Sequence, residues 1–111
     1  PMQLLKSTKI KEPEVPKAYL VAMITINDME GMGSYMANVP QTVADHGGRF
    51  LVRHMGEKLH AEGDPNPVTV VIEFPDADAA MAWKTSDAYQ AILPGRVDNS
   101  EGPLVVCEGV G

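Results

Sequence analysis

Four side chains in this sequence could act on a small molecule: a guanidinium, a carboxylate, an imidazole and a phenol. The first two belong to Arg53 and Glu73, in residues 49–55 and 68–74, which alternate like the two strands of a hairpin. An in-phase pairing of these strands places Arg53 and Glu73 together on one face. In a cavity, the arginine would hold an oxygen and the carboxylate would orient it or transfer a proton. On an open face, they would form an ion pair of small energetic value.

His54 and Tyr35 supply the imidazole and the phenol. His54 directly follows Arg53, so in a strand it points to the opposite face, where it could act as a base near neutral pH. Tyr35 lies on the apolar side of a predicted helix, where a tyrosine most often packs in the core with one hydrogen bond. It could equally present its hydroxyl to a pocket. The candidate catalytic residues are therefore Arg53, Glu73, His54 and Tyr35.

The elements that must position these side chains follow the order strand, helix, strand, strand, helix, strand. They are strand 18–26, a helix between residues 28 and 47 that Pro40 kinks or splits, strands 49–55 and 68–74, a helix from Asp76 to Ser86, a short helix 87–93 closed by Pro94 and Gly95, and strand 104–108. This order predicts an α+β, ferredoxin-like βαββαβ protomer, in which an antiparallel sheet carries two helices on one face.

We expect one domain at residues 18–111, preceded by an N-terminal arm at residues 1–17. A chain of 111 residues is long enough for a single core. Prolines and charged residues oppose a regular element in the arm. The amine of Pro1 would suit catalysis if a strand followed at once, but the first apolar segment begins only near Ala18, which disfavours that role.

Composition excludes several classes of partner. Hydrophobic residues at 44% and charged residues at 22% are typical of a soluble globular protein. A formal net charge of -6 argues against nucleic acid or an anionic membrane as the main partner. The sequence also shows no apolar run long enough for a membrane span and no secretory signal. The single cysteine, Cys107, cannot form an internal disulfide, so we expect a cytoplasmic protein.

We expect neither a metal nor a cofactor. His54, His60 and Glu62 are close in sequence, but residues six apart in a strand lie about 20 Å apart, too far to share one ion. The sequence also lacks a phosphate-binding glycine loop, a nucleophile elbow and a paired-cysteine motif.

The second face of the predicted sheet is apolar. Leu51, Met55 and Val71 are expected to share this face, which the two helices leave uncovered. Because such a face would not stay in contact with water, we expect a homodimer in which a second copy of the chain covers it.

Several motifs occur together in the chain: Gly47 to Arg53, Val71 to Pro75, Ala82-Trp83 with Ser86 and Tyr89-Gln90, and Leu104 to Gly109. Over roughly residues 17–110 they resemble a bacterial family known as a domain of unknown function, DUF1330, of the dimeric α/β-barrel superfamily. The resemblance implies a ferredoxin-like protomer, two of which join their sheets into a barrel. It matches the family pattern at Tyr35, Arg53, Glu73, Trp83, Ser86, Tyr89 and Arg96, and departs from it at His54 and at Lys84-Thr85.

From this resemblance we add four candidate substrate-binding residues, Trp83, Ser86, Tyr89 and Arg96. Two kinds of function stay open. The first is a cofactor-independent enzyme of the isomerase, cyclase or monooxygenase type, acting on a small oxygenated or carboxylate-bearing molecule. Arg53 would fix an oxygen, Glu73 or His54 would move a proton and Tyr35 would donate a hydrogen bond. The alternative is a dimeric module that binds such a molecule without converting it.

Overall fold

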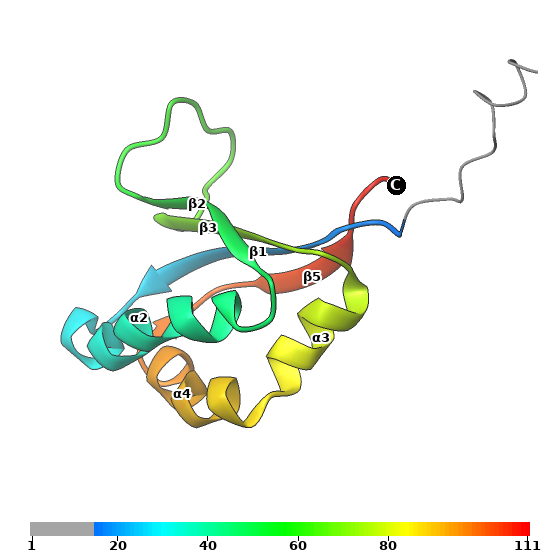
Figure 1. Ribbon diagram of the computed structural model, residues 1–111. Helices are drawn as coiled ribbons and strands as arrows, with labels where there is room; N and C mark the ends of the chain where they lie inside the picture. Colours follow the sequence, from blue (N-terminus) through cyan, green and yellow to red (C-terminus); the bar gives the residue numbers. More distant parts are fainter. Residues whose placement is uncertain (1–14) are drawn as a thin grey trace, which may run out of the picture.

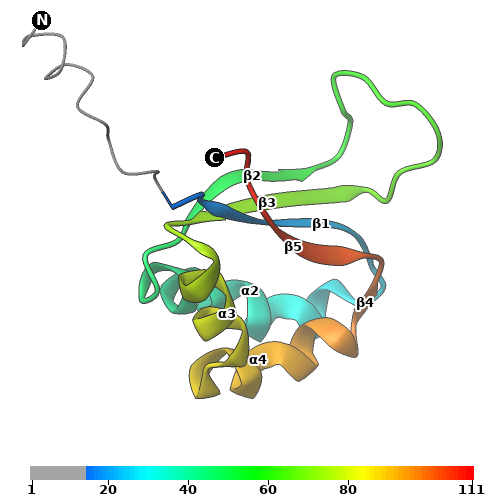
Figure 2. The ribbon, with the colours of Figure 1, turned by 90° about the vertical axis from the view of Figure 1, so that its right-hand side faces the viewer.

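The structure is a computed structural model that describes residues 15–111. An antiparallel sheet forms one layer, and the helices lie together against one of its faces (Figures 1 and 2). The order of the main elements confirms the predicted α+β, ferredoxin-like protomer. The predicted N-terminal arm, Pro1 included, lies outside the described residues except for positions 15–17.

Strand β1 runs through the centre of the sheet. The strands are β1 (Ala18–Ile26), β2 (Arg49–Met55), β3 (Val68–Phe74), the short β4 (Ser100–Glu101) and β5 (Leu104–Glu108). Their order is β2-β3-β1, and both β5 and β4 pair with the other edge of β1. Of the two partners that the sequence left open for the last strand, the first strand or another subunit, the structure shows the first strand.

Three helices cover one face of this sheet: α2 (Met29–Ala44), α3 (Ala77–Thr85) and α4 (Asp87–Val97). The side chains of Asp28, Asp76 and Ser86 cap their N-termini, and each accepts a hydrogen bond from a backbone amide three residues on. These polar residues begin the helices as the sequence predicts. Ser86 also separates α3 from α4, because its backbone is extended.

The two interior prolines do not end their helices. Pro40 lies within α2, which is not split. Helix α4 was expected to end at Leu93, but it continues through Pro94 to Val97, and the carbonyl of Pro94 accepts a hydrogen bond from the amide of Asp98 at 2.9 Å. A proline has no amide donor, but its carbonyl can still accept a helical hydrogen bond. This extension is what places Arg96 in the last turn of the helix.

Large aromatic side chains fill the space between the helices and the sheet. Phe74, Trp83 and Tyr89 are fully buried, with ring centroids 5.4 Å apart for the first two and 4.0 Å apart for the last two. Such a cluster buries much of the apolar surface available to a small domain. Trp83 and Tyr89 therefore both belong to the hydrophobic core.

A β-bulge in β2 changes which side chains face the helices. Phe50 pairs with Ile72 and Val52 pairs with Val71, so Leu51 is an extra residue without a partner on β3. One extra residue reverses the alternation of every side chain that follows it. Beyond the bulge, Arg53 lies on the side of the helices, together with Met55.

The face of the sheet away from the helices carries three cross-strand rows. The first is a row of four valines, Val52, Val71, Val21 and Val105, the second consists of Arg49, Glu73, Tyr19 and Cys107, and the third consists of His54, Thr69 and Met23. Val71 lies on this face as predicted. The prediction for Met55 is wrong, because the bulge turns that side chain to the helices.

The packing around Gly48 predicts a measurable effect of a single methyl group. A Cβ atom at Gly48 would lie 2.7 Å from Cε1 of Phe74 and 2.8 Å from Cγ1 of Val43, two fully buried side chains. We expect Gly48→Ala to lower the free energy of unfolding by about 1–3 kcal/mol through overpacking. The control Gly33→Ala, inside α2 with open space around the new methyl group, should raise it by about 0.5–1 kcal/mol. Urea unfolding of both variants tests this, and equal effects would contradict it.

Candidate functional site

A cavity of about 350 Å³ lies between the sheet and the helices. Apolar side chains of β1, β3 and α2 form most of its wall. One cross-strand row, Arg53, Val70, Ala22 and Leu104, crosses its floor. Ala22 lies in the middle of this row, where its small side chain leaves space that a larger residue would fill.

Arg53 lies at the mouth of the cavity. Its side chain is exposed to solvent and also lines the cavity, and its Cζ atom lies 4.9 Å from the centroid of the Phe50 ring. A guanidinium over an aromatic face is held by the quadrupole of the ring while its N–H groups stay available. Arg53 can therefore donate hydrogen bonds to a molecule that enters the cavity.

Tyr35 extends from α2 into the cavity wall and is almost fully buried. Its hydroxyl lies 3.0 Å from that of Tyr89, and either can be the donor. Burial raises the pKa of Tyr35 well above that of an ordinary tyrosine, and the neighbouring Tyr89 raises it further. Tyr35 is thus a neutral group that can donate one hydrogen bond if it accepts one from Tyr89.

Arg96 approaches the same tyrosine from α4. Its Cζ atom lies 6.0 Å from the centroid of the Tyr35 ring, and the side chain lines the cavity. Its Nε atom is buried and has no hydrogen-bond partner within the part of the chain that the structure describes. A buried donor without an acceptor is uncommon in folded proteins.

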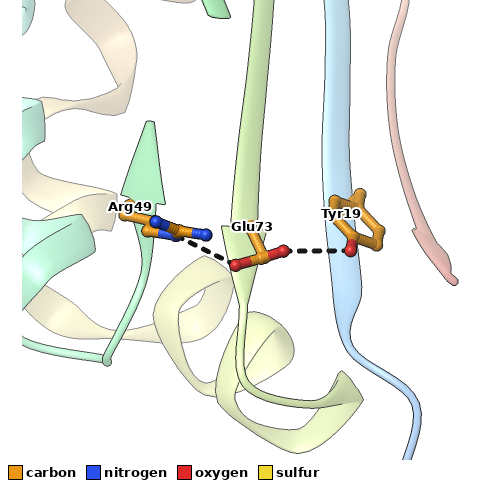
Figure 3. A network of polar contacts seen from close by, with 3 residues as sticks. All are labelled: Tyr19, Arg49 and Glu73. Atoms are coloured by element: carbon orange, nitrogen blue, oxygen red, sulfur yellow. Dashed lines mark hydrogen bonds and ion pairs between the residues drawn. The ribbon is translucent and has the colours of Figure 1, made fainter. Parts of the chain in front are cut away.

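The predicted pairing of Arg53 with Glu73 is wrong. Glu73 lies on the face of the sheet away from the helices, where its Oε1 accepts from Nε of Arg49 and its Oε2 accepts from the hydroxyl of Tyr19, both at 3.0 Å (Figure 3). The Glu73 side chain is only 14% exposed, compared with 71% for Arg49. The bulge places Arg49 opposite Glu73 and moves Arg53 to the other face.

These two hydrogen bonds shift the pKa of Glu73 and that of Tyr19. The bond from Arg49, followed by that from Tyr19, holds the pKa of Glu73 below its ordinary value. The same carboxylate raises the pKa of Tyr19, because it accepts a hydrogen bond from the tyrosine hydroxyl. Glu73 is therefore an ionised, fully engaged carboxylate and is poorly suited to accept a proton from a ligand.

His54 does not face the cavity either. It is exposed, pairs with Thr69 across the hairpin, and its Nε2 lies 2.8 Å from the backbone carbonyl of Glu57. Of the four predicted catalytic residues, the structure therefore brings Arg53 and Tyr35 to one cavity and places Glu73 and His54 on the other face of the sheet.

Two of the four predicted substrate-binding residues line the cavity and two do not. Trp83 lines the cavity, and its Nε1 donates to Oγ1 of Thr42 at 3.0 Å. Arg96 lines it as well. Tyr89 is buried behind Tyr35, outside the cavity lining. Ser86 is a capping residue, whose Oγ accepts from the amide of Tyr89 and donates to the carbonyl of Trp83.

Sequence reasoning missed Arg49 and Tyr19 as the partners of Glu73. A signal was present, since Arg49 occupies the first position of the same strand as Arg53. Choosing between the two arginines requires the position of the bulge, and no glycine or proline within β2 marks it.

The described residues contain no group of three histidine, cysteine or acidic side chains that could hold a metal ion. His60 and Glu62 are within 2.9 Å of each other, but both are highly exposed and they have no third partner of this kind. Within residues 15–111, no helix has the length and apolar character needed to cross a bilayer.

The family described as "Domain of unknown function (DUF1330)" matches residues 17–110. The chain belongs to the DUF1330 family. The predicted membership is confirmed, and the match includes every helix and strand of the structure. No curated protein matches this DUF1330 chain.

Solved structures share the fold of this DUF1330 member. A protein of unknown function from Rhodopseudomonas palustris has a TM-score of 0.66 at 10% identity, over 100% of this chain and 95% of that one. The methylated form of that protein has a TM-score of 0.65 at 12% identity, over 100% and 93%. SnoaB, a cofactor-independent oxygenase from Streptomyces nogalater, has a TM-score of 0.59 at 12% identity, over 87% and 96%. At these identities, the likeness concerns the fold alone.

The network around Glu73 predicts a pH-dependent contribution to stability. The pKa of Glu73 is lowered in the folded state, so its contribution is present above the pKa of the unfolded state and is lost as the pH falls through the folded-state value. We expect Glu73→Gln to lower the melting temperature at neutral pH and to have a smaller effect at acidic pH, once the wild-type carboxylate has also become protonated. Thermal unfolding at neutral and at acidic pH measures this.

The matched control is Glu62→Gln, in the exposed pair with His60. An exposed pair of this kind contributes little, so this substitution should leave the melting temperature unchanged at both pH values. A Glu73→Gln effect that is independent of pH would contradict the assignment of Glu73 as a carboxylate stabilised by Arg49 and Tyr19.

Proposed function

We propose that this chain binds a small, largely apolar organic molecule that carries an oxygenated, acidic group, in the cavity between the sheet and the helices. The observation that carries the proposal is the composition of the cavity wall: apolar side chains surround three polar ones, Arg53, Tyr35 and Arg96. All three can donate hydrogen bonds, and the two arginines are cations. Apolar walls with a few convergent polar groups are typical of small-molecule sites of this volume.

Each residue would contact a different part of the ligand, according to its position in the cavity. Arg53, exposed at the mouth, would meet the acidic group as it enters. Trp83, whose indole N–H is already bonded to Thr42, would offer its apolar surface to the body of the ligand. The hydroxyl of Tyr35 would donate to a carbonyl or enolate oxygen.

A second candidate function is a cofactor-independent enzyme that acts on the same class of molecule. The likeness in fold to SnoaB, named as a cofactor-independent oxygenase, supports this candidate. Donors at a buried site can stabilise an enolate that develops during a reaction. The displacement of Glu73 and His54 from the cavity favours binding without conversion, because neither can remove a proton there.

We also propose that two copies of the chain associate through the face of the sheet away from the helices. Val21, Val52 and Val105 of the row of four valines are 39%, 40% and 50% exposed. Exposed apolar side chains gathered in one row, with polar residues on either side, are typical of an interface. The exposed free thiol of Cys107 lies on the same face and supports a cytoplasmic location, where thiols stay reduced.

Binding can be measured through Trp83, the only tryptophan of the sequence. We expect 4-hydroxybenzoate or octanoate to change its fluorescence in a saturable way, and Arg53→Met to weaken this binding about tenfold through loss of a charge-assisted contact. Arg49→Met is the matched control, because it removes an arginine from the same strand but from the opposite face. It should leave the affinity unchanged.

The proposal fails if neither acid binds or if the two arginine substitutions have equal effects. A further substitution, Ala22→Leu, adds volume to the floor of the cavity and should weaken binding of both acids. Turnover of a bound acid, followed as oxygen consumption or isomerisation, would favour the enzyme.

Association of two copies can be tested with substitutions in the row of four valines. We expect the chain to sediment as a dimer and Val52→Lys with Val105→Lys to sediment as a monomer, because two charges would be buried at the interface. Met81→Lys, on an exposed position of α3, is the control and should not change the mass. Analytical ultracentrifugation measures all three, and a monomeric wild-type chain would contradict the proposal.

A further inference from the structure

The cavity contains positive charge without a compensating acid. Among the described residues, its ionisable side chains are Tyr35 of α2, Arg53 of β2 and Arg96 of α4, and β1, β3, β5 and α3 contribute only apolar residues and Trp83. The carboxylate of Glu73, on the neighbouring strand β3, is turned away and is engaged by Arg49 and Tyr19. Nothing in the cavity wall neutralises the two guanidinium groups.

Arg96 brings a second guanidinium group to the cavity wall. The last turn of α4 is held by hydrogen bonds from Oγ of Ser100 and from the amide of Asn99 to the carbonyl of Arg96, at 2.6 and 3.3 Å. The buried Nε of the same residue has no acceptor within residues 15–111. Because this atom has almost no accessible surface, an oxygen anion in the cavity would meet the terminal N–H groups of the guanidinium, which bind such oxygens strongly.

The cavity also lacks a group that could accept a proton from a ligand. The two arginines offer hydrogen-bond donors and no acceptor. Tyr35 is neutral, and its hydroxyl is shared with Tyr89. A weak acid that enters this cavity therefore either keeps its proton or releases it to water.

We propose that the cavity binds weak acids of the phenol or enol class as their anions, and that the ligand releases its proton to solvent on binding. This inference rests on the proposed function and names the ligand class and its bound state. The O–H bond of the ligand breaks, the electron pair stays on its oxygen in the cavity that Arg96 and Arg53 line, and the proton passes to water. The nearby cations lower the pKa of the bound ligand, so the affinity rises with pH until the pH reaches the pKa of the free ligand.

The probe is 4-nitrophenol, because its phenolate absorbs at longer wavelength than its neutral form. Below the pKa of the free phenol, we expect added protein to produce the phenolate band. Calorimetry in two buffers of different ionisation enthalpy should show release of about one proton per bound molecule where the free phenol is protonated. The methyl ether 4-nitroanisole cannot ionise and should bind at least about tenfold more weakly, with no dependence on pH.

Substitutions of the two arginines test whether these residues cause the shift of the phenol pKa. Arg96→Met and Arg53→Met should each reduce the shift of the phenol pKa, by about one unit for a lost cation in direct contact. Arg96→Lys retains the charge and should preserve part of the shift if Arg96→Met does not fold. Arg49→Met, on the opposite face, should leave the shift unchanged.

The possible outcomes separate this inference from the proposed function. Binding of 4-nitrophenol without the phenolate band, or equal binding of 4-nitroanisole, overturns the inference and leaves the proposed function standing. Binding of carboxylates but not of 4-nitrophenol at any pH has the same meaning. No change in Trp83 fluorescence with any of these compounds overturns both.

Discussion

The bulge at Leu51 is the constraint on which the rest of the site depends. It adds one residue to β2 relative to β3, so the strand presents Arg49 to one face of the sheet and Arg53 to the other. Without it, Arg53 would lie on the outer face and the side chain of His54 would point to the helices. The chemistry of the cavity is therefore determined by the register of one strand as much as by the residues in it.

The two faces of the sheet consequently carry different kinds of polar group. On the outer face, Glu73 neutralises Arg49 and binds Tyr19, so that charge is satisfied within the protein. On the face toward the helices, Arg53 and Arg96 have no acidic neighbour in the cavity wall. A satisfied network contributes to the folded state, whereas unsatisfied donors in a cavity are available to a ligand.

Sequence reasoning predicted the order of elements because each rests on local signals: the apolar run of β1, the capping side chains of Asp28, Asp76 and Ser86, and Gly47, whose φ of 77° ends the turn after α2. It also predicted Arg53 and Tyr35 as site residues that line the cavity, and Trp83 and Arg96 among its candidates. It did not predict the partner of Glu73, because a bulge depends on packing between strands and leaves no signature in β2.

The hydrogen bond from Trp83 to Thr42 has a consequence for selectivity. The Thr42 hydroxyl in turn donates to the carbonyl of Val39, so the indole is anchored through α2 to the backbone. The Trp83 side chain loses its rotational freedom when the chain folds, so ligand binding costs little further side-chain entropy. A rigid wall of this kind selects ligands by shape. Molecules that a flexible pocket could accommodate by rearrangement would not fit.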